Sequence, residues 1–162
     1  MIIKPFEVEK KNLKHNRFFL LYGENQGFKN EIIKKKFSKN VYQYEENEII
    51  NNEEKFFNNI LSKSFFENEK TIIICRATDK IKDIIEEIIE KDVKDIIIIL
   101  NSNNLEKKSK IRSFFEKDKR TICIPFYEDN SQTLISIANT FFRNNKVPIS
   151  QQSINLIVER CR

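Results

Sequence analysis

Apolar residues in the first 126 positions form two kinds of pattern that alternate along the chain. Short runs, most of them unbroken and rich in Phe, Ile and Leu, predict five strands at residues 18–22, 41–44, 71–75, 96–100 and 121–126. Runs without polar interruption are typical of strands in a parallel sheet that is buried on both faces. The pattern therefore predicts an α/β fold with a five-stranded, mostly parallel sheet.

Between these runs, apolar residues recur every three or four positions and predict four helices that flank the sheet. The first helix carries the stripe that starts at Phe28, and the second covers residues 49–61. Asp79 is expected to cap the third helix and Asn104 the fourth, since both residue types accept hydrogen bonds from free N–H groups at a helix start.

The strand pattern stops after residue 128, and two helical stripes follow with Ser150 as the expected cap of the second. We therefore divide the chain into an α/β domain, residues 1–128, and a partial helical lid, residues 129–162. Two helices alone leave apolar faces uncovered, and the last stripe reaches Arg162 without a C-cap signal. The sequence is thus expected to be part of a longer protein.

Composition excludes several classes of protein. The chain is 40% hydrophobic and 33% charged, and its apolar runs are far shorter than the roughly 18–20 residues that span a bilayer. The first residues show no secretory leader, so we expect a cytoplasmic protein without membrane contact. Cys75, Cys123 and Cys161 are interpreted as structural, and a single histidine without a Cys-x-x-Cys motif predicts no metal site.

The charge balance leaves contact with nucleic acid open. There are 29 basic and 24 acidic residues, which gives a formal net charge of +5. This excess permits binding to a polyanion but does not demonstrate it, because the two signs are mixed along the chain. We interpret the runs at Lys34–Lys36 and Lys107–Lys108 as solvated helix faces.

The two glycines of the chain, Gly23 and Gly27, both follow the first strand, where nucleotide-binding α/β domains place a phosphate loop. A working loop reads G-x-x-x-x-G-K-[ST], with the lysine directly after the second glycine and a hydroxyl residue after the lysine. Here Phe28 separates Gly27 from Lys29, and Asn30 stands where the hydroxyl residue belongs. We interpret the segment as a degenerate phosphate loop, with Lys29 as a surface lysine and the glycines serving a tight turn.

The second half of an ATPase site is also missing from the sequence. An acidic pair at the end of a buried strand would hold magnesium and activate water. The expected strands end instead in Arg76-Ala77-Thr78 and Asn101-Ser102-Asn103. We therefore expect no catalytic residues, no cofactor and no ATP hydrolysis.

An aromatic doublet, Phe65-Phe66, lies in the otherwise polar connection before the third strand. Four other Phe-Phe doublets fall inside expected helices or strands, whereas this one does not. Two large aromatic residues in a polar connection do not both enter the core easily, so we weigh core packing against an exposed anchor for a partner.

The order of these features resembles the delta subunit of bacterial DNA polymerase III. The resemblance is carried by the segment from Phe18 to Asn25, the doublet before residues 70–74, the segment from Asp95 to Lys110, and Cys123 to Tyr127. It extends over nearly the whole chain, and members of that family are about twice as long.

This resemblance implies an AAA+ fold that has lost ATP binding and helps to open the β sliding clamp during DNA replication. The hydrophobic pair that enters the clamp in that family matches Phe65 and Phe66, although the family pair is commonly Leu-Phe. The other partners implied are further clamp-loader subunits, joined through C-terminal collar helices beyond Arg162, and DNA indirectly through the complex. The subunit itself is no enzyme, although the family is catalogued under DNA-directed DNA polymerase.

Two alternatives of different classes stand beside this hypothesis. One is a P-loop nucleotide-binding enzyme with a divergent loop, which predicts nucleotide binding with magnesium. The other is a basic nucleic-acid-binding module, which predicts an affinity that falls steeply with salt, whereas an aromatic wedge predicts weak salt dependence.

Overall fold

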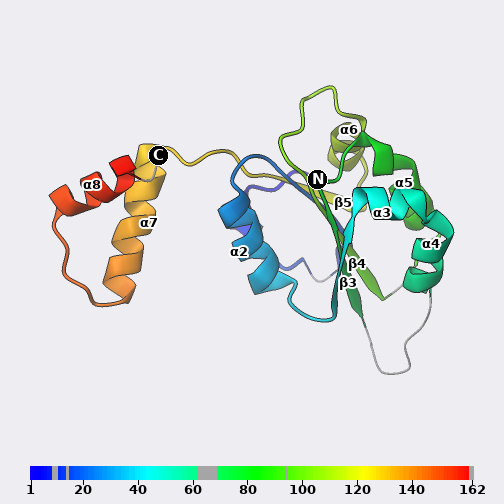
Figure 1. Ribbon diagram of the computed structural model, residues 1–162, viewed down its shortest axis with the longest axis horizontal. Helices are drawn as coiled ribbons and strands as arrows, with labels where there is room; N and C mark the ends of the chain where they lie inside the picture. The colour runs from blue at the N-terminus through cyan, green and yellow to red at the C-terminus, as the bar shows by residue number, and fades with distance from the viewer. Residues whose placement is uncertain (9–10, 14, 62–68, 94, 161–162) are drawn as a thin grey trace. The chain divides into compact units, whose positions relative to one another are not determined.

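The computed structural model describes residues 1–8, 11–13, 15–61, 69–93 and 95–160, and the chain divides into two compact units. Unit 1 covers Met1–Phe126 and unit 2 covers Tyr127–Arg162. Figure 1 shows the helices and strands of both units. Each unit is described by itself.

Unit 1 is built on a five-stranded sheet whose paired strands are all parallel, in the order β2-β3-β4-β1-β5. The strands are β1 (Phe18–Tyr22), β2 (Val41–Glu45), β3 (Lys70–Cys75), β4 (Ile96–Asn101) and β5 (Thr121–Pro125). This arrangement confirms the α/β fold class, and the strand positions agree with the sequence pattern to within one residue at each end.

Helices cover both faces of the sheet in unit 1 (Figure 1). They are α1 (Pro5–Val8), α2 (Gln26–Lys36), α3 (Glu46–Asn51), α4 (Glu53–Leu61), the 3-10 helix η1 (Asp79–Ile81), α5 (Lys82–Glu90) and α6 (Lys110–Lys117). The helices α3 to α6 pack on one face, and α1 and α2 pack on the other. The stretch expected as one helix over residues 49–61 is divided at Asn52, which ends α3.

Successive side chains of β1 point to opposite faces of the sheet, and both faces are covered. Phe18, Leu20 and Tyr22 belong to the core under α3 to α6, whereas Phe19 and Leu21 belong to the core under α2. All five side chains are at most 3% exposed. Unbroken apolar runs therefore marked strands that bury both faces, as expected from the sequence.

Two expected helix caps are wrong: Asp79 contacts a different helix, and Asn104 lies six residues before α6 begins. Thr78 caps η1, while Asp79 accepts hydrogen bonds from Ser109 Oγ (2.6 Å) and the backbone N–H of Ile111 (3.0 Å) at the start of α6. The carboxylate thus caps a neighbouring helix. Ser109, and not Asn104, is the local cap of α6, because its hydroxyl accepts from the N–H of Arg112.

The N-terminal residues run beside the outer edge of β5, which the sequence pattern did not indicate. The N–H of Ile3 donates to the carbonyl of Cys123 (3.0 Å), and the N–H of Cys123 donates to the carbonyl of Met1 (2.9 Å). Ile3 is 1% exposed and belongs to the core under α2. Three residues therefore extend the hydrogen bonding of the sheet past β5.

Unit 2 consists of α7 (Ser131–Asn144) and α8 (Gln151–Arg160). The side chain of Ser150 accepts from the N–H of Ser153, so the expected cap of α8 is confirmed. Within α8, Ile154 and Val158 are buried, whereas no residue of α7 is buried. None of the described helices is both long enough and apolar enough to cross a membrane.

Candidate functional site

The degenerate phosphate loop lies at the carboxyl edge of the sheet, between the end of β1 and the start of α2. Gly23 adopts a φ of +120°, and an added Cβ there would lie 2.1 Å from the carbonyl oxygen of Phe126. Gly23 therefore serves the tight turn that the sequence predicted, because no other residue fits this close approach. Gly27 lies in α2, where an added Cβ would make only an ordinary contact of 3.9 Å with Asn25 Oδ1, so its assignment to the turn is wrong.

Backbone N–H groups of the loop are hydrogen-bonded to acceptors of the chain itself. The N–H of Gly23 donates to the carbonyl of Asn103 (3.1 Å), and the N–H of Asn25 donates to that of Phe126 (3.3 Å). The N–H of Phe28 donates to the Asn25 side chain (3.0 Å), which caps α2. A phosphate loop uses such groups to surround an anion, and here they bind protein oxygens instead.

Lys29 is fully buried, so its interpretation as a surface lysine is wrong. Its side chain is 0% exposed, and its Nζ donates to the carbonyl oxygen of Ser102 at 2.6 Å. Burial lowers the pKa of Lys29, because removal from water disfavours the charged amine. The amine that could reach a phosphate therefore contacts the loop after β4.

Two side-chain hydrogen bonds also link the degenerate phosphate loop to the segment after β4. Gln26 Nε2 donates to Asn103 Oδ1 (3.0 Å), and Asn104 Nδ2 donates to Glu24 Oε1 (3.1 Å). The Glu24 carboxylate adds negative charge to the loop, and a nucleotide phosphate would be repelled by it. The loop is thus occupied by contacts within the chain.

The strand ends that would carry the acidic pair of an ATPase hold other groups. Beyond β3, Arg76 forms an ion pair with Glu45 (2.8 Å). At the end of β4, the atoms Asn101 Oδ1 and Ser102 Oγ are buried and have no hydrogen-bond partner. In the part of the chain that the structure describes, no three His, Cys, Asp or Glu side chains gather as a metal site would require.

We predict that nucleotide with magnesium will not bind to this protein at millimolar concentration. The reason is that Lys29 and the N–H groups of the loop would have to leave buried protein acceptors before they could bind phosphate. Isothermal titration with Mg-ATP measures this directly. Saturable binding with micromolar affinity would contradict the prediction and favour the divergent P-loop enzyme.

The doublet Phe65-Phe66 lies outside the described residues, but the structure describes both ends of the connection that carries it. The connection leaves the end of α4 and returns at β3, on the amino edge of the sheet, opposite the degenerate phosphate loop. Asn40 Nδ2 donates to the carbonyl of Glu69 (3.1 Å), and Lys70 Nζ donates to the carbonyl of Asn59 (3.3 Å). The ends of the connection are therefore held by specific hydrogen bonds.

The other four Phe-Phe doublets lie in β1, α4, α6 and α7, as the sequence pattern indicated. In α6, for example, Phe115 is fully buried and contacts Phe114 edge to face at 5.7 Å between ring centres. Phe65-Phe66 is thus set apart from them by sequence position, and its role as an anchor stays a prediction.

The cysteine interpretation can be examined at two of its three positions. Cys123 is fully buried in β5, and this burial raises the pKa of its thiol to about 12. Cys75 at the end of β3 is half-buried, and burial raises the pKa of its thiol as well. Both thiols pack in the core of unit 1, whereas Cys161 lies outside the described residues.

Comparison with known proteins defines the class of fold. No family model matches the sequence, and no curated protein matches it. Among solved structures, the chain is similar to the Bacillus subtilis DNA clamp loader delta protein (YqeN), with 13% identity and a TM-score of 0.64. The match covers 95% of this chain and 51% of that chain, so the chain spans about half the length of that protein.

The chain is also similar to domain III of the Thermotoga maritima replication initiation protein DnaA, with 13% identity and a TM-score of 0.44. That match covers 96% of this chain and 72% of that chain. The likeness to the clamp loader delta protein shows the fold: the chain shares the α/β fold of that structure, with a parallel sheet between helices, as the sequence pattern predicted.

Proposed function

We propose that this protein is a clamp-loader delta-type module that binds a β sliding clamp and performs no catalysis of its own. The proposal is supported above all by the likeness of 95% of the chain to the clamp loader delta protein of Bacillus subtilis. The absence of catalysis is supported by the hydrogen bond from Lys29 Nζ to the Ser102 carbonyl, since the buried amine is out of reach of a nucleotide.

Phe65 and Phe66 are the proposed anchor that enters the clamp. An aromatic side chain that moves from water into an apolar pocket contributes roughly 1.5–3 kcal/mol, less the costs of association. A protein that binds the open clamp more tightly than the closed clamp shifts that equilibrium by the difference in affinity alone. Clamp opening therefore requires no active site in this chain, and sister subunits would supply ATP-dependent control.

The first experiment is a titration of the protein with the β clamp from the same source. We expect saturable binding that falls at least tenfold in the Phe65→Ala/Phe66→Ala variant, a change of about 1.4 kcal/mol. The matched control is Phe141→Ala/Phe142→Ala, which removes two phenylalanines from α7, a helix without buried residues. The control should bind the clamp like the wild type.

Two results would overturn the proposal. The first is absence of wild-type binding at high micromolar concentration of clamp. The second is an equal loss in both double variants, which would mean that exposed aromatic surface in general drives the association. Circular dichroism of each variant shows whether the fold is retained.

A further inference from the structure

Both ends of the connection between α4 and β3 are tied to each other and to the start of β2. Near the end of α4, the carbonyl of Asn59 accepts a hydrogen bond from Lys70 Nζ at 3.3 Å. Ahead of β3, the carbonyl of Glu69 accepts a hydrogen bond from Asn40 Nδ2 at 3.1 Å. We call these four residues, Asn40, Asn59, Glu69 and Lys70, the stem of the connection.

Lys70 links three other elements of unit 1. Its backbone N–H donates to the carbonyl of Asp95, ahead of β4, at 2.9 Å. Its amine lies 6.0 Å from the centre of the Tyr42 ring on β2 and donates to Asn59 on α4. The half-buried side chain also lines a hollow of about 310 Å³ between β2, β3 and α4. Lys70 therefore holds the return of the connection against both the sheet and the helix that the connection leaves.

Asn40 holds the same return from the side of β2. Its φ is +47°, in the left-handed region that asparagine adopts more readily than most residues with a side chain. In this conformation its carbonyl accepts from the N–H of Thr71 at 3.0 Å, while its side chain donates to Glu69. Two successive residues pairs of the chain are thus joined through one asparagine.

The elements that carry the stem are themselves firmly packed. Phe56 and Ile60 of α4 are 3% and 4% exposed and belong to the core under α3 to α6. The Phe56 ring also contacts Tyr44 of β2 edge to face, at 5.3 Å between ring centres. The stem therefore joins supports that are fixed in the core, and its hydrogen bonds restrain both ends of the connection.

We propose that Asn40 and Lys70 are positioning residues for clamp binding, because they hold the ends of the connection that carries Phe65 and Phe66. This inference rests on the proposed function, in which the two phenylalanines bind the clamp. A connection with restrained ends loses less conformational freedom on binding, so a larger fraction of the molecules is competent to bind. Neither Asn40 nor Lys70 has to touch the clamp.

The test is a kinetic binding measurement on immobilised β clamp from the same source, with the stem variant Asn40→Gly/Lys70→Met. Glycine keeps the φ of position 40 accessible, and methionine keeps most of the alkyl chain, while both side-chain donors are lost. We expect the affinity to fall about three- to tenfold, as the loss of exposed hydrogen bonds predicts. The association rate should carry the loss, since only the fraction of competent molecules changes.

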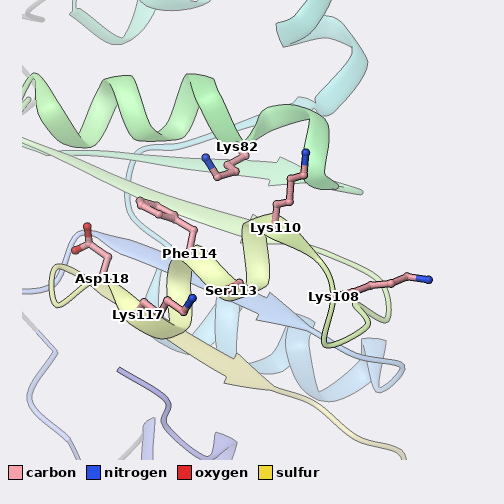
Figure 2. Close-up of a pocket in the computed structure, with 7 residues that line it drawn as sticks. All are labelled: Lys82, Lys108, Lys110, Ser113, Phe114, Lys117 and Asp118. Atoms are coloured by element: carbon pink, nitrogen blue, oxygen red, sulfur yellow. The ribbon is translucent and has the colours of Figure 1, made fainter.

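The matched control is Ser38→Gly/Lys117→Met, which also introduces one glycine ahead of β2 and also lowers the formal net charge from +5 to +4. Ser38 and Lys117 are exposed and form no hydrogen bond or ion pair within the described part of the chain. Lys117 lies on α6, where it lines a shallow hollow with Phe114 and Asp118 (Figure 2). The control should bind the clamp with the rates of the wild type.

A conservative variant separates the amine contact from the general shape of the side chain. Lys70→Arg keeps a positively charged donor beside Asn59 and Tyr42, so it should retain the affinity of the wild type. Urea denaturation shows whether each variant is folded. If the double stem variant is strongly destabilised, Asn40→Gly and Lys70→Met are measured singly against the same expectation for the association rate.

The positioning role fails on any of three results. Wild-type affinity of the stem variant, with loss of binding in Phe65→Ala/Phe66→Ala, overturns the positioning role alone and leaves the proposed function standing. Faster dissociation with an unchanged association rate assigns Asn40 and Lys70 to the clamp contact itself. Absence of wild-type binding overturns the proposed function and the positioning role with it.

Discussion

Replacement of Gly23 by alanine is expected to lower the free energy of unfolding by at least about 3 kcal/mol and to leave little folded protein at 37 °C. The added Cβ would lie 2.1 Å from the carbonyl oxygen of Phe126, and the φ of +120° is itself unfavourable for a residue with a side chain. The obstructing atom is backbone at the end of β5, so it has no rotamer change by which to move away. Urea denaturation followed by circular dichroism measures the effect.

Gly27→Ala is the matched control for this prediction. Gly27 lies in α2, and the nearest atom to an added Cβ is Asn25 Oδ1 at 3.9 Å, an ordinary contact. Alanine favours a helix over glycine by roughly 0.5–1 kcal/mol, so this variant should be as stable as the wild type or slightly more stable. Equal stability of Gly23→Ala and Gly27→Ala would contradict the close approach of Gly23 to the carbonyl oxygen of Phe126.

The second large effect is expected at Lys29. Lys29→Ala removes a fully buried side chain and the donor to the Ser102 carbonyl, and should cost about 2–4 kcal/mol of unfolding free energy. Lys29→Met keeps most of the volume and buries no charge, so it should cost clearly less. The comparison is made by urea denaturation at pH 7. Equal stability of the wild type and Lys29→Ala would contradict the burial of this side chain.

The contribution of Lys29 should also depend on pH in a defined direction. Burial lowers its pKa below the usual value of 10.5, so between the lowered pKa and 10.5 the unfolded chain binds more protons than the folded chain. The unfolding free energy of the wild type should therefore rise relative to Lys29→Met as the pH increases through this window. A difference that stays flat up to pH 10.5 would show that the amine is not desolvated.

The sheet could be predicted from the sequence because its signal is local. Unbroken apolar runs such as Ile96–Leu100 predict strands buried on both faces, and the structure places each of them in the parallel sheet. The degenerate phosphate loop could also be predicted from the sequence. Its marks, Gly23 and the lack of a hydroxyl residue at position 30, lie within one short segment.

The contacts that define the candidate site were not readable, because they join residues far apart in the chain. Lys29 meets Ser102 across 73 positions, and Asp79 caps α6 across 30 positions to Ser109. A lysine on a helix also carries no local mark of burial, since most lysines are exposed. Phe65 and Phe66 lie outside the described residues, so their role stays a prediction.

The hydrogen bond from Lys29 to Ser102 has a mechanical consequence for unit 1. It joins α2, which covers one face of the sheet, to the end of β4, at the centre of the sheet. Together with the Gln26–Asn103 and Glu24–Asn104 hydrogen bonds, it links the start of α2 to the segment after β4 at the carboxyl edge of the sheet. We therefore expect α2 and the sheet to move as one body, because hinge motion between them would break these three hydrogen bonds.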